Sequence, residues 1–173
     1  PGRNPGRINR WANRLLEQTV IRRADAVLFV TRANLAEFST SYGADIARRF
    51  HLVPNGCDPS EFDTIAAAPT GDRFVLLHAG SLYEWRNPLS LIRHIGTAIE
   101  GGAISRERFR LRLLGPIVLD VDLAAECRRL GLDDVVELVP RVSRREGLRE
   151  MASASALLLL QPTTTVSVPG KAY

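Results

Sequence analysis

The stretch "FVLLHAGSLYEWRNPLSLI", residues 74–92, decides the fold of this chain. Its apolar first part, Phe74 to Gly80, is typical of a strand that is buried on both faces of a sheet. Pro88 suits the first turn of a helix, and the apolar pattern extends this helix to Glu100. A strand that enters a helix through a glycine-containing loop indicates the beginning of a βαβ unit.

The same alternation continues downstream. Strands are predicted in "RFRLRLLG", which ends at Gly115, in "VVELVP" and in "ALLLL" at residues 156–160. Helices are predicted in "DLAAECRRLG" and in "SRREGLREMASA", where Ser143 and Glu146 have the spacing of a capping box. Strands that alternate with helices of this size predict an α/β fold with a Rossmann-like, doubly wound parallel sheet and helices on both faces.

A shorter series precedes it. The predicted elements are an amphipathic helix from Ile8 to Ala24, a buried strand from Ala26 to Thr31, a short helix closed by Gly43, and a strand ended by Pro54. Residues 60–72 hold proline and glycine without strong periodicity, which indicates a linker. We therefore predict one domain within residues 1–59 and a second within residues 73–173.

The composition indicates a folded, soluble protein. The chain has 173 residues, of which 45% are hydrophobic, and its apolar runs are far shorter than the about 20 residues that a membrane span needs. We expect a cytoplasmic location because no signal peptide is recognisable. Cys57 and Cys127 lack further ligands at metal-binding spacing, so we expect reduced thiols and no metal site.

The net charge of +4 comes mostly from arginine. Several arginines and one tryptophan cluster in "PGRNPGRINRWANR" at the start of the chain. This cluster has two interpretations, a patch for nucleic acid or anionic lipid and a solvated helix face. We favour the solvated face and expect no nucleic-acid partner.

Candidate site residues follow the predicted strands, because ligands of doubly wound sheets bind at the carboxyl ends of the strands. The loop after the strand at residues 74–80 offers a glycine backbone and polar donors before a helix N-terminus, which favours anions. It matches neither the dinucleotide fingerprint nor the P-loop, and a tight turn with a surface arginine is the alternative. The candidates in this loop are Gly80, Ser81, Arg86 and Asn87.

Three other strand exits also hold candidate residues. Gly115 on its own is more typical of a structural residue at a strand end than of a functional one. Residues 139–142 either face a base or form a simple strand-to-helix turn. The final stretch "SVPGKAY", residues 167–173, combines Gly170 and Lys171 at what resembles a helix start, so it is either an anion site or a solvated chain end. We expect structural roles for the three histidines, His51, His78 and His94.

Taken in order, these segments resemble a family 4 glycosyltransferase of the GT-B fold. The resemblance rests on "RRADAVLFVTRANLAEFSTSYG", "HLVPNGCDPSEF", "FVLLHAGSLYEWRNPLSLI", "LRLLG" and "SVPGKAY". It implies two Rossmann-like domains that face each other across a cleft. Residues 1–59 would then be the last part of the acceptor-side domain, residues 73–173 most of the nucleotide-sugar donor domain, and the chain an internal piece truncated at both ends.

The resemblance also implies roles for individual residues. Gly80, Ser81, Arg86, Asn87, Gly170 and Lys171 would bind the donor diphosphate, and Gly115, Pro140, Arg141 and Val142 would lie on the side of the nucleobase. Ser81 stands where family members often carry an arginine, which removes one cation. In the family a glutamate commonly follows the motif "PGK", residues 169–171 here, and it would come just after Tyr173. The catalytic residues are expected outside this chain.

The function implied is transfer of a sugar from a nucleoside-diphosphate sugar to an acceptor hydroxyl, without a cofactor or a metal ion. The acceptor would be a saccharide, a lipid-linked or another hydroxyl compound, as in the synthesis of cell-surface polysaccharides. The enzyme would be either free in the cytoplasm or in peripheral contact with the inner membrane face. This piece alone is expected to be inactive. Two alternatives are a UDP-sugar epimerase of the same fold and a non-catalytic module that binds nucleotide sugars or anionic polymers.

Overall fold

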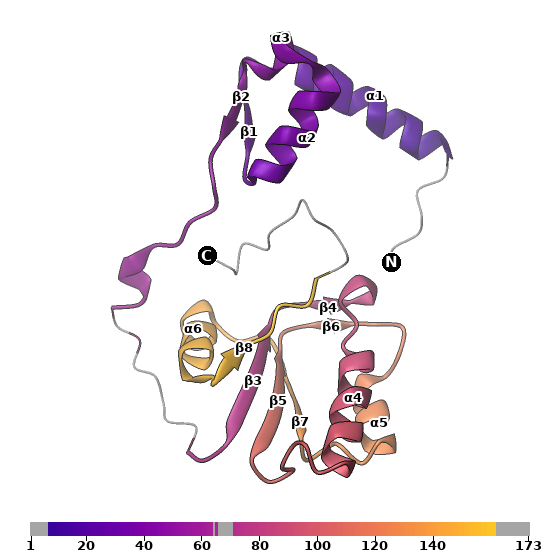
Figure 1. Ribbon diagram of the computed structural model, residues 1–173, viewed down its shortest axis with the longest axis vertical. Helices are drawn as coiled ribbons and strands as arrows, with labels where there is room; N and C mark the ends of the chain where they lie inside the picture. The colour runs from indigo at the N-terminus through magenta and orange to yellow at the C-terminus, as the bar shows by residue number, and fades with distance from the viewer. Residues whose placement is uncertain (1–6, 64, 66–70, 162–173) are drawn as a thin grey trace. The chain divides into compact units, whose positions relative to one another are not determined.

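The structure is a computed structural model that describes residues 7–63, 65 and 71–161 (Figure 1). The chain forms two compact units, which divide between Cys57 and Asp58. Each unit combines helices with strands that pair in parallel. The predicted α/β class with Rossmann-like, parallel sheets is therefore confirmed.

The first unit is built on two short parallel strands. Its elements are α1 (Arg7–Arg23), β1 (Val27–Phe29), α2 (Arg32–Tyr42), α3 (Ala44–Ala47) and β2 (Phe50–Leu52). Aromatic side chains fill its core, where the Phe29 ring centroid lies 5.2 Å from that of Phe38 and 5.0 Å from that of Phe50. The Thr31 hydroxyl caps α2 by accepting from the Asn34 amide, and Gly43 with φ 78° ends the helix as predicted.

The amphipathic helix α1 packs through a different face than its sequence pattern indicates. Trp11 and Leu16 are 67% and 65% exposed, whereas Ile21 near the helix end is buried at 6%. The Tyr42 hydroxyl donates to the Glu17 carboxylate at 2.7 Å, and the Arg49 guanidinium donates to the Arg22 carbonyl at 3.2 Å. Polar contacts and the helix C-terminus thus attach α1, and its large apolar side chains stay exposed.

The second unit contains the predicted strand and helix series. Its principal elements are β3 (Phe74–Ala79), α4 (Leu89–Glu100), β5 (Phe109–Leu114), α5 (Leu123–Arg129), β7 (Val136–Val139), α6 (Arg144–Ser153) and β8 (Ala156–Leu157). Four short elements were not predicted, and these are η1 (Pro59–Glu61), β4 (Leu82–Tyr83), η2 (Glu84–Arg86) and β6 (Ile117–Val118).

Two strands are shorter than the sequence predicts. The strand expected at Ala26–Thr31 is only Val27–Phe29, and the strand expected at residues 156–160 is only Ala156–Leu157. Among the described strands β8 pairs only with β3, and the Leu158 amide still donates to the Leu77 carbonyl at 2.8 Å. Pro88 stands at the N-cap of α4 rather than inside its first turn.

The segment predicted as a linker is partly attached to the second unit. The chain divides after Cys57, slightly earlier than the predicted domain end at residue 59. The Asp58 carboxylate caps η1 by accepting from the Ser60 amide at 3.0 Å. Glu61 then accepts from Arg144 of α6, with the Arg144 Nε 2.7 Å from Glu61 Oε1. This ion pair holds the first residues of the predicted linker against α6.

The strands of the second unit form a parallel sheet in the order β7-β5-β3-β8. In this register Leu76 lies beside Leu111, and Leu113 lies beside Leu138. The chain moves outward from β3 to β5 and β7, and then returns to place β8 on the other side of β3. The direction of winding therefore reverses between β3 and β8, as in a doubly wound sheet.

One face of this sheet carries the main apolar core. Leu111 of β5 and Ile92 of α4 are fully buried, and Cys127 of α5 is 2% exposed within the same cluster. Each such aliphatic side chain contributes about 1.5–3 kcal/mol by leaving water. Burial also raises the pKa of the Cys127 thiol, so this cysteine is a small apolar core residue.

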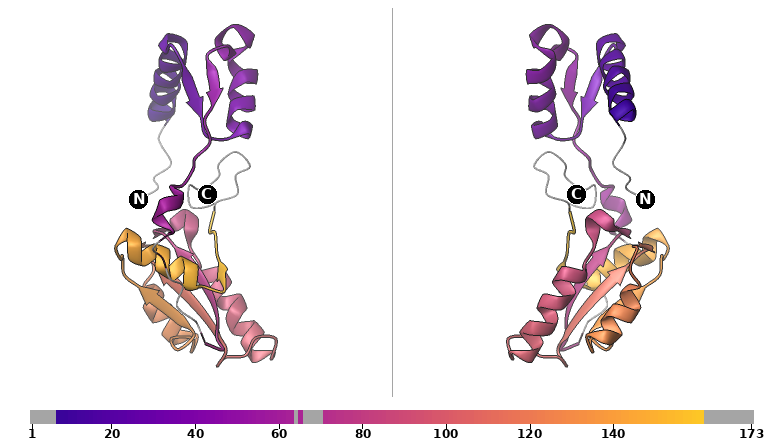
Figure 2. Two further views of the ribbon diagram at one scale, coloured as in Figure 1. Left: turned by 90° about the vertical axis from the view of Figure 1, so that its left-hand side faces the viewer. Right: turned by 90° about the vertical axis from the view of Figure 1, so that its right-hand side faces the viewer.

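Helix α6 covers the opposite face of the sheet (Figures 1 and 2). A network of charged side chains lies on this face. The arginines of "RFRLRLLG" alternate with its leucines, so Arg112 points to this face. Its guanidinium donates to Glu137 of β7 at 2.7 Å and to Glu150 of α6 at 2.5 Å. Burial lowers the pKa of Arg112, but its hydrogen bonds to both carboxylates outweigh this effect, and the pKa is raised.

Candidate functional site

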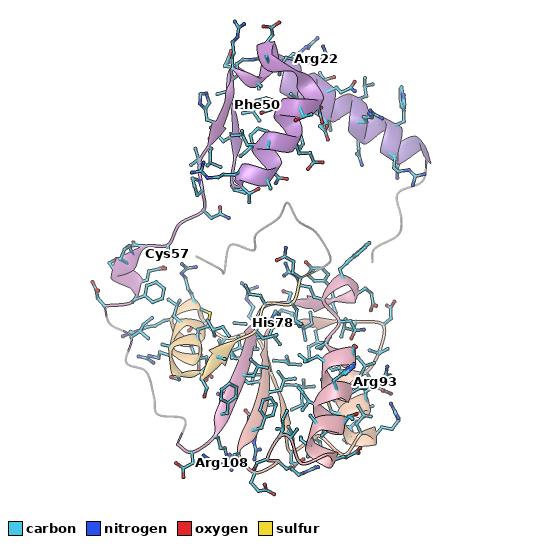
Figure 3. The ribbon with its side chains drawn as sticks, viewed as in Figure 1. Arg22, Phe50, Cys57, His78, Arg93 and Arg108 are labelled. Atoms are coloured by element: carbon cyan, nitrogen blue, oxygen red, sulfur yellow. The ribbon has the colours of Figure 1, made fainter. Side chains whose placement is uncertain are left out.

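The strand order places the candidate site at the carboxyl ends of β3 and β8. Ligands of open α/β sheets bind outside the carboxyl ends of the strands, at the point where the strand order reverses. The loop after β3 holds Gly80, Ser81, Arg86 and Asn87, which the sequence predicted as a site. His78 near the end of β3 and Arg108 before β5 mark the two opposite ends of the sheet in Figure 3.

Two glycines bring the exits of β3 and β5 together. The Gly80 amide donates to the Leu114 carbonyl at 2.8 Å, and the Gly115 amide donates to the Val139 carbonyl at 2.9 Å. A Cβ atom on Gly115 would lie 2.4 Å from the Gly80 carbonyl oxygen, and the φ of Gly115 is 135°. Only glycine satisfies both conditions, so Gly115 has a clear backbone role at the strand end. Its place beside a nucleobase stays a prediction.

Beyond these glycines the two loops pair again as a small parallel sheet. The strands β4 and β6 place Leu82 beside Ile117 and Tyr83 beside Val118. Leu82 is 1% exposed and anchors this pair in the main core. The pairing was missed because each strand has only two residues, too few for a periodic pattern.

The Glu84 carboxylate adds a second connection between the two loops. Its Oε1 atom accepts from the Asp120 amide at 2.9 Å. The loop after β3 is thus held to the loop after β5 at three levels: the glycines, the β4–β6 pair and this carboxylate. A loop held in this way presents its side chains from a defined position.

Arg86 is the cation that this loop presents. Its Cζ atom lies 5.1 Å from the centroid of the Tyr83 ring. Its Nε atom is buried and has no hydrogen-bond partner among residues 7–63, 65 and 71–161. Buried N–H groups rarely lack an acceptor in proteins, so an anionic ligand would suit this donor.

Two other predicted residues have simpler surroundings. The Asn87 side-chain oxygen, one residue before the N-cap, accepts from the Leu89 amide at 3.0 Å and so satisfies the first N–H group of α4. Its side-chain amide group is not used in this bond, and Asn87 therefore serves the helix whether or not it also contacts a ligand. Ser81 is exposed beside Gly80.

The exit of β7 leads into α6 through Pro140, Arg141 and Val142. The first two are exposed and Val142 is half-buried. The Ser143 hydroxyl accepts from the Glu146 amide at 3.3 Å, which confirms the predicted cap. Gly170 and Lys171, the remaining predicted site residues, lie outside the residues that the structure describes.

Two of the histidines, His78 and His94, contact backbone carbonyl groups. The His78 ring, 3% exposed, has its Nδ1 atom 2.9 Å from the Leu158 carbonyl oxygen, which connects β3 to the segment after β8. The Nδ1 atom of His94 lies 2.7 Å from the Ser90 carbonyl oxygen within α4. Among the described residues no group of three or more His, Cys, Asp or Glu side chains is arranged to hold a metal ion.

Comparison with known proteins identifies relatives of this chain. No protein-family profile matches it. It is 32% identical over 146 residues to a protein named D-inositol 3-phosphate glycosyltransferase from Kineococcus radiotolerans, which covers 75% of this chain and 33% of that protein. The chain thus spans about a third of the length of this curated relative.

Solved structures show the same fold at low sequence identity. The glycosyltransferase WaaG, described as involved in lipopolysaccharide biosynthesis, matches 89% of this chain and 45% of its own with a TM-score of 0.61 and 19% identity. Sucrose-phosphate synthase from Thermosynechococcus elongatus matches 98% of this chain and 44% of its own with a TM-score of 0.64 and 14% identity. The chain therefore has the GT-B fold of glycosyltransferases and is related in sequence to one of them, as its motifs implied.

Proposed function

We propose that the protein to which this chain belongs transfers a sugar from a nucleoside-diphosphate sugar to an acceptor hydroxyl. The observation that carries the proposal is the Arg86 guanidinium, held at the switch point of a GT-B fold with a buried donor that no described residue satisfies. The relationship in sequence to a glycosyltransferase favours transfer over the epimerase and over a binding module without activity.

The proposed chemistry assigns charge stabilisation to the protein. Negative charge develops on the diphosphate as the bond to the sugar breaks, and fixed cations and amides stabilise that charge. Arg86 would supply one cation, Lys171 a second, and the N-terminus of α4 the positive end of a helix dipole. The proposal therefore assigns no step to a metal ion or to another cofactor.

Further residues along the phosphates and beside the nucleobase complete the proposed donor site. The backbone of Gly80 and the side chains of Ser81 and Asn87 would lie along the phosphates, together with Gly170. The segment from Pro140 to Val142 and the backbone near Gly115 would flank the nucleobase, because the exits of β5 and β7 end at the same edge of the sheet.

The acceptor and the location belong to the same proposal. We assign the first unit to the acceptor-side domain and the acceptor to a saccharide, lipid-linked or other hydroxyl compound, in a pathway of cell-surface polysaccharide synthesis. A cytoplasmic enzyme with peripheral contact at the inner membrane face fits α1, where Trp11 and Leu16 are exposed beside Arg10 and Arg14. Every helix within the described residues is too short or too polar to span a bilayer.

Binding of candidate donors tests the site. The complete protein is titrated calorimetrically with UDP-glucose, GDP-mannose and inorganic pyrophosphate. Loss of a hydrogen-bonded charge in Arg86→Ala should weaken binding of the preferred nucleotide sugar by about 10- to 100-fold, and Lys171→Ala should act in the same direction. Arg108→Ala is the matched control, because it removes the same charge at the opposite end of the sheet (Figure 3).

Three outcomes would contradict the proposal. Unchanged affinity in both Arg86→Ala and Lys171→Ala would show that the diphosphate binds elsewhere. Steep salt dependence without nucleotide preference would favour the module for anionic polymers. Conversion of the UDP-sugar to its epimer without any acceptor would favour the epimerase. Chromatography would detect the epimer as a separate product of unchanged mass.

A further inference from the structure

We propose that Tyr83 is a positioning residue that holds the Arg86 guanidinium ready to bind the diphosphate of a nucleotide. The inference rests on the proposed function, because it concerns the same anion site. In this site an aromatic ring, rather than an acidic partner, fixes the cation.

Local backbone geometry brings the two side chains together. Residues 84–86 form the single 3-10 turn η2, and Tyr83 is its N-cap with extended backbone angles of φ −144° and ψ 172°. Residues three apart lie on the same side of a 3-10 turn, since this helix has three residues per turn. The Arg86 Cζ atom consequently lies over the Tyr83 ring, 5.1 Å from its centroid.

The ring itself is held by the sheet beneath it. Tyr83 is the last residue of β4 and lies beside Val118 of β6. The preceding residue, Leu82, is 1% exposed, and the following residue, Glu84, accepts from the Asp120 amide. Tyr83 is nevertheless 36% exposed, so the ring is a fixed surface feature and not a core side chain.

This contact leaves the arginine free for a ligand. A cation that lies over an aromatic face is attracted by the π electrons, and none of its N–H donors is consumed. An acidic partner would instead occupy the donors that an anion needs. No carboxylate within the described ranges lies within ion-pair distance of Arg86, and its Nε donor is unused there. The ring thus limits the motion of Arg86 and preserves its binding capacity.

Preorganisation of this kind lowers the entropy cost of binding. An arginine that is already held in place loses less rotamer freedom when an anion arrives. The benefit disappears if the ring is removed, and it remains if only the phenol hydroxyl is removed. These two cases separate the proposed role from a general effect of altering the loop.

The test is a double-mutant cycle on the complete protein, with UDP and GDP as calorimetric probes. Tyr83→Leu should weaken binding of the preferred nucleotide by about two- to fivefold, the range expected for an exposed cation–π pair. Tyr83→Phe should keep the affinity of the unaltered protein, and Tyr83→Leu should have no further effect when Arg86→Ala is already present. Trp85→Leu is the matched control, because it removes a 63% exposed aromatic side chain from the same turn.

Each result has a defined meaning. Equal affinities for Tyr83→Leu and the unaltered protein, together with weakened binding in Arg86→Ala, would overturn the positioning role and leave the proposed site intact. An equal loss from Tyr83→Leu with and without Arg86 would show a structural role and would also overturn it. Unchanged affinity in Arg86→Ala, or absence of binding by both nucleotides, would overturn the proposed function, and the inference with it.

Discussion

Gly115→Ala should destabilise the second unit more than a Gly→Ala substitution at any other glycine of this unit that has a positive φ. The new Cβ would lie 2.4 Å from the Gly80 carbonyl oxygen and 2.8 Å from its carbonyl carbon. Both atoms belong to the backbone, so no side chain can turn away to relieve the overlap. The exits of β3 and β5 must move apart by about 1 Å to reach ordinary contact.

The expected cost has two parts. Holding alanine at φ 135° costs about 1–3 kcal/mol in backbone strain. Forcing a methyl group into a close-packed contact costs about 1–3 kcal/mol more. The total of about 2–6 kcal/mol is large compared with the about 5–15 kcal/mol by which most domains are stable. The Gly80 to Leu114 and Leu82 to Pro116 backbone hydrogen bonds should weaken as the strands separate.

Urea unfolding followed by tryptophan fluorescence measures this cost. The chain has two tryptophans, Trp11 in the first unit and Trp85 in the second, so a Trp11→Phe background makes the signal report on the second unit alone. The control is Gly131→Ala, where φ is 62° but nothing lies within 4 Å of the added Cβ. It should lose only about 1–2 kcal/mol from its left-handed backbone. Equal losses in free energy of unfolding for Gly115→Ala and Gly131→Ala would refute the argument from close approach.

Two further predictions concern charged pairs of the second unit. Arg112→Ala should lower the free energy of unfolding by about 1–3 kcal/mol, because it removes the cation shared by Glu137 and Glu150 and leaves Glu137 only the longer contact with Arg110 at 4.0 Å. A smaller effect of Arg112→Ala in a Glu150→Gln background would confirm the coupling, and equal effects would argue against it. The bond from Arg106 lowers the pKa of Asp134, so its stabilising contribution is present above the ordinary carboxyl pKa and is lost as the pH falls through the lowered value. The difference in unfolding free energy between Asp134→Asn and the unaltered protein should therefore shrink from pH 7 toward acid, and a difference independent of pH would contradict this reasoning.

The sequence alone predicted the class, the order of the main elements and several of their ends. The run from Phe74 to Gly80 is apolar apart from His78, as is typical of a strand covered on both faces, and single residues, Gly43 and Ser143, indicate the two helix caps. These features depend on neighbours a few positions away in the chain. Local spacing is therefore enough to recognise them.

Only the tertiary structure decided where the ends of these elements meet. The position of β8 beside β3 creates the switch point, and the contact between Gly80 and Gly115 joins loops that are far apart in the sequence. The β4–β6 pair is too short to leave a pattern, yet it fixes the ring over which Arg86 lies. Such pairings depend on long-range packing, which the order of residues in any one segment does not specify. Residue types indicated the candidate site, and the three-dimensional register decided which of these residues lie close together.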